Sequence, residues 1–152
     1  MARELYEDFD KLNEWPTHVY LQAGVGGFAA AVAFEIRKSW KVQPKIIVVE
    51  PDAAPCLERS VKNGSILTVD GPVSDMGRLD CKTPSLLAFD ILSEAADEFS
   101  IITEEQALDA VQISDSIGLK TSPSGAAGLA GLLSNPVENA SPLIFITEGS
   151  VS

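Results

Sequence analysis

Residues 20–34 read YLQAGVGGFAAAVAF, so that an apolar stretch passes through three closely spaced glycines into an alanine-rich run. The apolar stretch predicts a buried strand and the alanines predict a helix, which places the glycines at a strand-to-helix turn. Glycine lets the backbone approach a ligand closely, and the first N–H groups of a helix attract an anion. The segment therefore predicts an α/β fold. Its turn either binds a phosphate or only allows the helix to pack closely on the sheet.

Strand and helix patterns alternate along the rest of the chain. Apolar runs predict strands at 17–22, 44–50, 65–69, 99–102 and 142–147. Helical spacing predicts helices at 2–13, 28–40, 53–62, 84–96, 103–116 and from Ser124 onward, with a loop at 71–81. The run PKIIVVE at 44–50 is apolar on both faces, which is typical of a parallel strand covered by helices. We therefore expect a three-layer α/β/α fold with a mainly parallel sheet.

Local signals mark the starts of three of these helices. Thr103 and Gln106 have the spacing of a capping box, in which each satisfies a backbone N–H of the other. Pro84 suits the first turn of its helix, and Ser124 has the residue type of an N-cap. These positions are expected to begin the fourth, fifth and last helices.

Charge and length exclude several classes of protein. Eleven basic residues against 22 acidic ones give a formal net charge of -11, which disfavours nucleic-acid and acidic-membrane partners. No apolar stretch reaches the roughly 20 residues that cross a bilayer, and no signal peptide is visible, so a cytoplasmic location is expected. Cys56 and Cys81 lack metal-site spacing and are expected to be buried or free thiols. The 152 residues suit one domain, 1–152.

The glycine turn also has the spacing of a dinucleotide fingerprint. Gly24, Gly26 and Ala29 satisfy G-x-G-x-x-A, and Glu50 ends the next strand, where a ribose-binding acid lies in such folds. A single phosphate would use the same device, because the N–H groups and the helix dipole do not distinguish the two ligands. An NAD-type binding module therefore stays open at this point.

Five ordered segments carry a resemblance that spans residues 4 to 149. They are THVYLQAGVGGFAAAV, IIVVEPDAAPCLERS, MGRLDCKTPSLLAFDIL, SPSGAAGLAGLL and IFITEG. In order and spacing they resemble the diaminopropionate ammonia-lyase family. That family belongs to the fold-type II pyridoxal-phosphate enzymes, alongside threonine dehydratase and the tryptophan synthase β chain. The resemblance implies amino-acid metabolism, with α,β-elimination of 2,3-diaminopropionate to pyruvate and ammonia.

The resemblance assigns cofactor-binding roles to two segments. Gly24, Val25, Gly26 and Gly27 match the loop whose amides hold the phosphate of pyridoxal 5'-phosphate. Thr147 resembles the hydroxyl residue that faces the pyridine nitrogen, and Gly149 would shape the adjoining turn. A neutral hydroxyl there would leave that nitrogen unprotonated, which favours β-elimination. The other interpretation of Thr147 is an ordinary threonine at a strand end.

Other matched positions are expected to be structural or to line the pocket. Ser122, Ser124 and Gly125, at a helix start, would line the pocket, and Glu50 and Asp52, in the VEPD motif, would be structural, whereas Asp80, Cys81 and Thr83 are expected only in a matched loop near the domain junction. In the resemblance Glu50 completes a strand-end turn, which removes its ribose role. Pro123 stands where the family segment has an acidic residue.

The resemblance also implies a Schiff-base lysine, which lies in an upstream segment of the family. No lysine here matches its context: Lys11, Lys38, Lys41, Lys45, Lys62, Lys82 and Lys120 are expected to be surface charges, and His18 to be structural. We therefore expect the C-terminal portion of such a lyase, with a phosphate subsite, no catalytic residue and no turnover by itself. A homo-oligomer or a complementing N-terminal half is the expected partner, and a non-catalytic scaffold domain is a further alternative.

Overall fold

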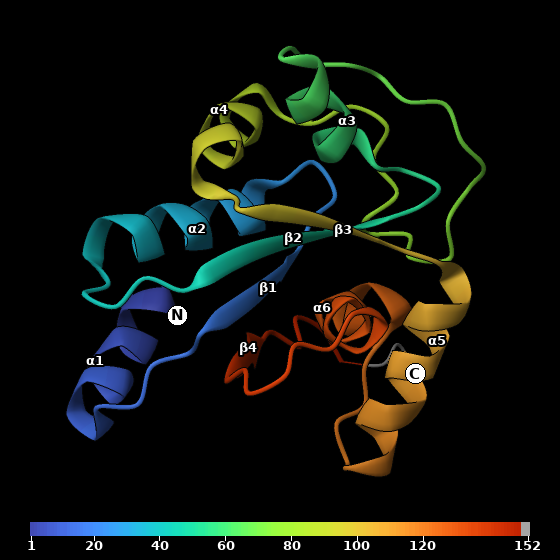
Figure 1. Cartoon of the computed structure of the whole chain (residues 1–152). Helices are drawn as coiled ribbons and strands as arrows, with labels where there is room; N and C mark the ends of the chain where they lie inside the picture. The colour runs from blue at the N-terminus through green and yellow to red at the C-terminus, as the bar shows by residue number, and fades with distance from the viewer. Residues whose placement is uncertain (150–152) are drawn as a thin grey trace.

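The computed structural model describes residues 1–149, which form a central sheet with helices on both faces (Figure 1). Four strands lie in the order β3-β2-β1-β4, and each neighbouring pair is parallel. The strands are β1 (His18–Gln22), β2 (Lys45–Pro51), β3 (Glu98–Ile102) and β4 (Pro142–Ile144). Because every pair is parallel, the carboxyl ends of the strands meet at one edge of the sheet, where ligands bind in open α/β folds.

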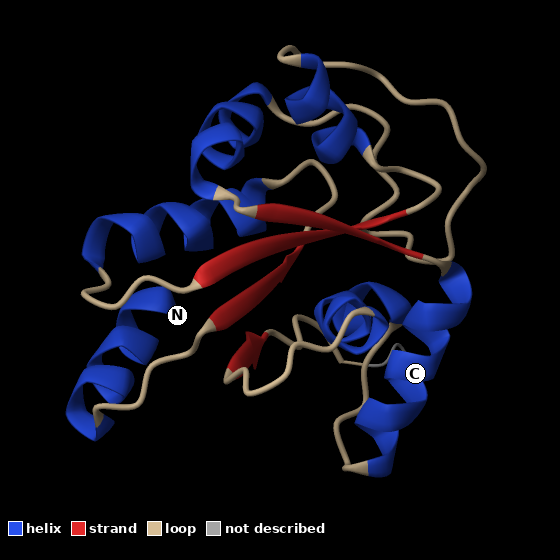
Figure 2. Cartoon of the chain, in the orientation of Figure 1, coloured by secondary structure: helices blue, strands red, loops and turns tan. Residues whose placement is uncertain are grey.

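Within residues 1–149, six helices make the two outer layers (Figure 2). One face carries α1 (Ala2–Leu12), α2 (Gly27–Ser39), α3 (Cys56–Asn63) and α4 (Leu86–Ala95), and the other carries α5 (Glu104–Ser116) and α6 (Pro123–Ser134). Alternate strand residues supply the two cores: Val19 and Val48 pack under α2, whereas Tyr20 and Val49 pack under α6. The expected three-layer arrangement is therefore confirmed.

Helix α6 lies close to the sheet because its inner face is built of small residues. A Cβ atom on Gly131 would lie 2.6 Å from Val49 Cγ2, and one on Gly128 would lie 3.0 Å from Gln22 Oε1. A larger residue at Gly131 would press on the buried Val49 side chain, and one at Gly128 would require the Gln22 side chain to shift, so these glycines let α6 pack closely on β1 and β2.

One of the three local helix signals is confirmed. Thr103 Oγ1 accepts from the N–H of Gln106 at 3.2 Å, and Gln106 Oε1 accepts from the N–H of Thr103 at 2.9 Å, which completes the capping box of α5. Two starts were misplaced by sequence. Ser122, and not Ser124, caps α6 by accepting from the N–H of Gly125, and Ser85, one residue after Pro84, caps α4.

Two expected strands differ from the structure. Residues 65–69 form no strand, because the N–H of Leu67 donates to Ser60 Oγ and that of Val69 donates to the carbonyl of Lys82 in an irregular loop. The last strand ends at Ile144 instead of Thr147. Beyond it, the carbonyl of Phe145 accepts from the side chain of Gln22 and leaves the ladder.

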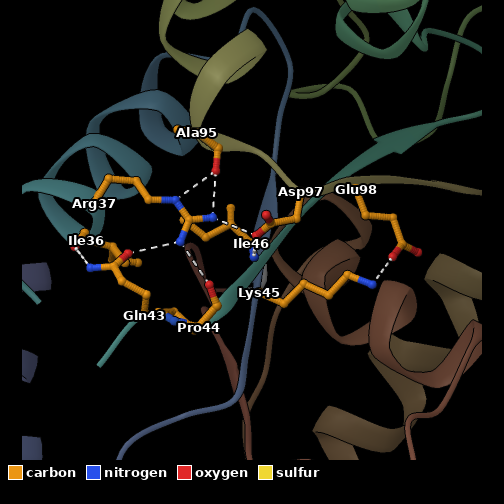
Figure 3. Close-up of polar contacts among 9 residues, drawn as sticks. All are labelled: Ile36, Arg37, Gln43, Pro44, Lys45, Ile46, Ala95, Asp97 and Glu98. Atoms are coloured by element: carbon orange, nitrogen blue, oxygen red, sulfur yellow. Dashed lines mark hydrogen bonds and ion pairs between the residues drawn. The ribbon is translucent and has the colours of Figure 1, made fainter. Parts of the chain in front are cut away.

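Arg37 ties α2, α4 and the start of β2 together (Figure 3). Its guanidinium donates to the carbonyl of Ala95 at 2.8 Å and to that of Pro44 at 3.0 Å, and it pairs with Asp97 at 2.6 Å. Asp97 in turn accepts from the N–H of Ile46 at 2.7 Å. One side chain thus caps the C-terminus of α4 and fixes the adjoining β2 strand.

Candidate functional site

The glycine turn, residues 23–27, lies at the carboxyl end of β1 and leads directly into α2. The N–H of Ala23 donates to the carbonyl of Val49 at 2.9 Å, which ties the turn to β2. The carbonyl of Val25 accepts from the N–H of Ser85 at 3.0 Å, which ties it to the start of α4. Gly26, at φ 100°, is the N-cap of α2. The turn is therefore held from two sides, and its backbone enters a conformation that glycine adopts readily.

Packing explains two of the three glycines but leaves space at the third. A Cβ on Gly24 would lie 2.8 Å from the carbonyl oxygen of Arg78, and one on Gly26 would lie 2.7 Å from Ala88 Cβ. A Cβ on Gly27 would meet nothing within 4 Å. Gly24 and Gly26 are thus required by the protein itself, whereas Gly27 opens onto free space beside the first turn of α2.

The backbone N–H groups of this turn form a cradle for an anion. Within residues 1–149, no protein acceptor takes the N–H of Gly24, Val25, Gly26 or Gly27. The first bond of α2 comes later, from the N–H of Ala30 to the carbonyl of Gly26. The first turn of α2 has no acidic residue. Unpaired N–H groups and the positive end of the helix dipole thus fit a phosphate group.

A cavity of about 350 Å³ opens over this turn. Its lining consists of the turn and the residues around it: Gln22, Ala23, Gly24, Val25, Gly26, Gly27, Phe28, Arg78, Leu79, Cys81 and Thr147. The lining brings the five expected cofactor-binding residues to one cavity. Among residues 1–149, Arg78 is its one cationic side chain, and no lysine takes part in it.

Gln22 fixes the position of Thr147, the threonine that lines the cavity. Its buried Nε2 donates to Thr147 Oγ1 at 3.1 Å and to the carbonyl of Phe145 at 2.9 Å. Since the Thr147 hydroxyl accepts from Gln22, its own proton is available to a second acceptor. Sequence reasoning missed Gln22, although its place at the carboxyl end of β1 is where parallel sheets position ligand-binding side chains.

Glu50 lies behind the glycine turn and has a structural role. Its buried carboxylate accepts from the N–H of Leu57 at 2.7 Å and from that of Glu58 at 2.9 Å, and so caps α3. Burial raises the pKa of Glu50 to about 7. Both oxygens are engaged with the helix and the side chain is enclosed, so Glu50 is not placed to hold a ribose. This agrees with the strand-end role and disfavours the dinucleotide interpretation.

The two cysteines flank Gly24 as free thiols, as expected. The buried Cys56 Sγ lies 3.6 Å from the carbonyl oxygen of Gly24, and burial raises the pKa of its thiol to about 12. Cys81 is partly exposed and lines the cavity. Cys56 is accordingly held as a neutral packing residue.

A cluster at the start of α6 includes residues expected there and three that sequence reasoning missed, Thr121, Arg78 and Glu148. Ser124 Oγ accepts from the N–H of Arg78 at 3.2 Å. The Glu148 carboxylate accepts from Ser122 Oγ and pairs with Arg78 Nε. The backbone carbonyl of Glu148 accepts from Thr121 Oγ1 at 2.8 Å. Arg78 and Glu148 lay inside the matched segments MGRLDC and ITEG, but their pairing joins positions that are far apart in the sequence.

The remaining matched residues lie outside the cavity lining. Asp80 pairs with Lys82 Nζ at 2.6 Å, and Lys82 also donates to the carbonyls of Ala53 and Pro72. The hydrogen bond of Lys82 to Asp80 lowers the pKa of that carboxyl. Thr83 bonds to Thr68 at 2.8 Å. The pair of Asp80 and Lys82 therefore supports the loop that carries Arg78.

The other expected candidates are placed away from the turn. His18 begins β1, at the opposite end of the strand, where its Nδ1 lies 2.8 Å from Thr17 Oγ1. In the part of the chain that the structure describes, no cluster of His, Cys, Asp and Glu could hold a metal ion. None of the helices over residues 1–149 is long and apolar enough to span a membrane.

Comparison with protein families gives a match over residues 1–148 to the model described as "Pyridoxal-phosphate dependent enzyme". Diaminopropionate ammonia-lyase of Escherichia coli (strain K12) is 38% identical over 101 residues, which cover 65% of this chain and 25% of the relative. L-threonine ammonia-lyase of Geobacter sulfurreducens is 32% identical over 133 residues, which cover 86% of this chain and 33% of the relative. The chain thus spans a quarter to a third of the length of these curated relatives.

Solved structures share the fold. The T.th. threonine deaminase superposes with a TM-score of 0.90 at 24% identity, over 99% of this chain and 56% of that one. Diaminopropionate ammonia lyase from Escherichia coli, in complex with D-serine, gives a TM-score of 0.80 at 28% identity, over 97% of this chain and 42% of that one. The mainly parallel sheet with helices on both faces is therefore an architecture found among solved amino-acid lyases.

Proposed function

This chain belongs to the family of pyridoxal-phosphate dependent enzymes, and from that premise we propose that it forms the phosphate-binding part of an ammonia-lyase acting on 2,3-diaminopropionate. The reaction removes the β-amino group by α,β-elimination. Overall it consumes one water and yields pyruvate and two molecules of ammonia. The 38% identity to the diaminopropionate enzyme, against 32% to an L-threonine enzyme over a longer match, supports this substrate over threonine.

The single observation that carries the proposal is the cradle of unpaired N–H groups at Gly24–Gly27. In the proposed complex these four N–H groups hold the cofactor phosphate at the start of α2, with the space beside Gly27 receiving it. The side chains of Leu57 and Ala88 pack against Gly26 from behind and keep the cradle in place.

Thr147 is proposed to face the pyridine nitrogen. When bound, pyridoxal 5'-phosphate supplies the electron sink for the elimination. Because Thr147 Oγ1 accepts from Gln22, the hydroxyl proton of Thr147 is available to an acceptor. A neutral ring nitrogen would be such an acceptor. A hydroxyl donor leaves that nitrogen uncharged, and a moderate electron sink suits β-elimination.

We propose that the chain binds the cofactor non-covalently and does not turn over by itself. The cavity lining of residues 1–149 includes no lysine, and Lys82, which is close in sequence, is committed to Asp80 and two carbonyls. The amine that the chemistry needs would come from a complementing N-terminal half.

The test is a titration of the pure chain with pyridoxal 5'-phosphate, NAD and inorganic phosphate, followed by fluorescence and by melting temperature. We expect stabilisation by the first and third ligands, no adduct that borohydride fixes, and no pyruvate release. Stabilisation by NAD alone would support the dinucleotide module. Pyruvate release by the chain alone would overturn the proposal on turnover.

A further inference from the structure

We infer that Arg78 is a second anion-binding group of the glycine-turn cavity, and that its guanidinium contacts the same phosphate monoester that the turn holds. The inference rests on the proposed function, because it concerns the same cavity. It adds a side chain that the sequence patterns did not single out for binding.

Arg78 adjoins the turn through its own backbone. Its carbonyl oxygen is the atom that a Cβ on Gly24 would meet at 2.8 Å, and its N–H is held by Ser124 Oγ at 3.2 Å. Arg78 is one of the residues that line the cavity together with Gly24–Gly27. The main chain of Arg78 is therefore fixed beside the cradle.

The guanidinium is held by one edge only. Its Nε pairs with Glu148, whose side chain is only 19% exposed and whose carboxylate also accepts from Ser122 Oγ. Among residues 1–149, no acceptor takes either terminal nitrogen of Arg78, and the side chain is 75% exposed. Glu148 thus restricts the orientation of the guanidinium while the two terminal nitrogens stay available for a ligand.

Charge favours an anion at this position. A phosphate monoester carries about -1.5 to -2 at neutral pH, whereas the end of a helix supplies only about half a positive charge. The chain has a formal net charge of -11, and Arg78 is the cation in the cavity lining of the described residues. Arginine binds phosphate through two parallel N–H bonds, so Arg78 would supply a directional contact, and a phosphate would share its positive charge with Glu148.

The experiment measures the dissociation constants of inorganic phosphate and pyridoxal 5'-phosphate for the wild type, R78Q, R78K and E148Q by calorimetry. R78Q is expected to weaken both by about tenfold or more, because it removes charge-assisted bonds. R78K should weaken the binding of both ligands less, since lysine keeps the positive charge but lacks the paired N–H donors of the guanidinium. E148Q should not weaken their binding, because it removes a carboxylate that competes with the phosphate for Arg78.

R59Q is the matched control. Arg59 is exposed and pairs with Glu58 outside the cavity, so its loss makes the same change in net charge without touching the turn. R59Q should bind phosphate like the wild type. L-alanine, which offers a carboxylate but no phosphate, should bind wild type and R78Q equally.

The outcomes separate this inference from the proposed function. If the wild type binds both phosphate ligands and R78Q binds them within twofold of it, Arg78 is only a structural partner of Glu148 and the inference is wrong. If R78Q affects only L-alanine, the guanidinium serves a carboxylate, and the inference is equally wrong. If the wild type binds neither phosphate ligand, the proposed function itself fails. Circular dichroism verifies that each variant folds. If R78Q does not fold, the dissociation constants of R78K are compared with those of the wild type instead.

Discussion

The side-chain amide of Gln22 donates to Thr147 Oγ1 at 3.1 Å, and so joins the end of β1 to the segment that follows β4. The same amide nitrogen holds the carbonyl of Phe145 at 2.9 Å. One buried side chain therefore ends the pairing of β4. It also fixes the position of Thr147, which has the only hydroxyl of the cavity lining within residues 1–149.

Replacement of Gln22 by leucine should destabilise the fold and displace Thr147. The buried carbonyl of Phe145 would lose its donor, which costs about 1–3 kcal/mol in the free energy of unfolding. Urea unfolding of Q22L measures this loss. Q112L, at an exposed position of α5, should unfold like the wild type, and an equal loss in both variants would contradict the role given to Gln22.

Gly27→Asp should remove phosphate binding without loss of stability. A side chain at this position meets no protein atom within 4 Å, and an acidic residue suits the first turn of a helix, so the fold is preserved. Its carboxylate would repel the phosphate, and the affinity for pyridoxal 5'-phosphate should fall by about tenfold or more. Fluorescence titration measures the affinity.

Ala31→Asp is the control for that substitution, because it adds the same charge to an exposed position one turn further along α2. It should retain most of the affinity. Equal weakening by both variants would mean that net charge, and not the cradle, governs binding.

Glu50 should make stability depend on pH. Its pKa is about 7 in the folded chain, above the usual 4.5, so the native state binds more protons than the unfolded state between these values. The contribution of Glu50 is fully present below about pH 4.5 and is lost as pH rises through 7. The free energy of unfolding should therefore fall over this window by up to about 3 kcal/mol relative to E50Q.

Urea unfolding of the wild type and E50Q at intervals from about pH 4 to about pH 8 measures this difference. Glu105→Gln, at an exposed position of α5, should keep the pH dependence of the wild type. A difference between wild type and E50Q that stays constant with pH would exclude the proposed titration of Glu50.

Arg37→Met should loosen the contact between α2 and α4. The carbonyls of Ala95 and Pro44 would lose a charged donor, and Asp97 would lose its partner, at a cost of about 2 kcal/mol (Figure 3). Lys38→Met removes the neighbouring, exposed charge and should change stability by less than about 0.5 kcal/mol. Thermal and urea unfolding of the two variants measure the contrast, and similar losses in both would argue against the Arg37 contacts.

Sequence predicted best what is decided locally. The capping box of Thr103 and Gln106 lies within a single helical turn, and the alternation of strands and helices follows from local apolar spacing, so both were predictable. Strand pairing was not. Residues 65–69, SILTV, have the composition of a strand, yet they lie beside the loop that contains Lys82 and not beside another strand. Only the tertiary structure determines which segments lie side by side.

The candidate site divides in the same way. The glycine turn was visible because its residues are consecutive, and the match of ordered segments placed Thr147 with it. Gln22, Arg78 and Glu148 act through partners that are distant in sequence, so no local pattern announces them. Pro123, which replaces an expected acid, simply occupies the first turn of α6.

In the proposed function, the glycines of the turn are required for different reasons. A side chain at Gly24 or Gly26 would clash with the protein's own atoms, whereas Gly27 faces open space, which in the proposed function receives the cofactor phosphate. A lineage that ceased to bind the cofactor would be released from its constraint at Gly27 alone and would still have to keep the other two. Substitution at this one codon, with its neighbours intact, would thus mark descendants that retained the scaffold after losing the ligand.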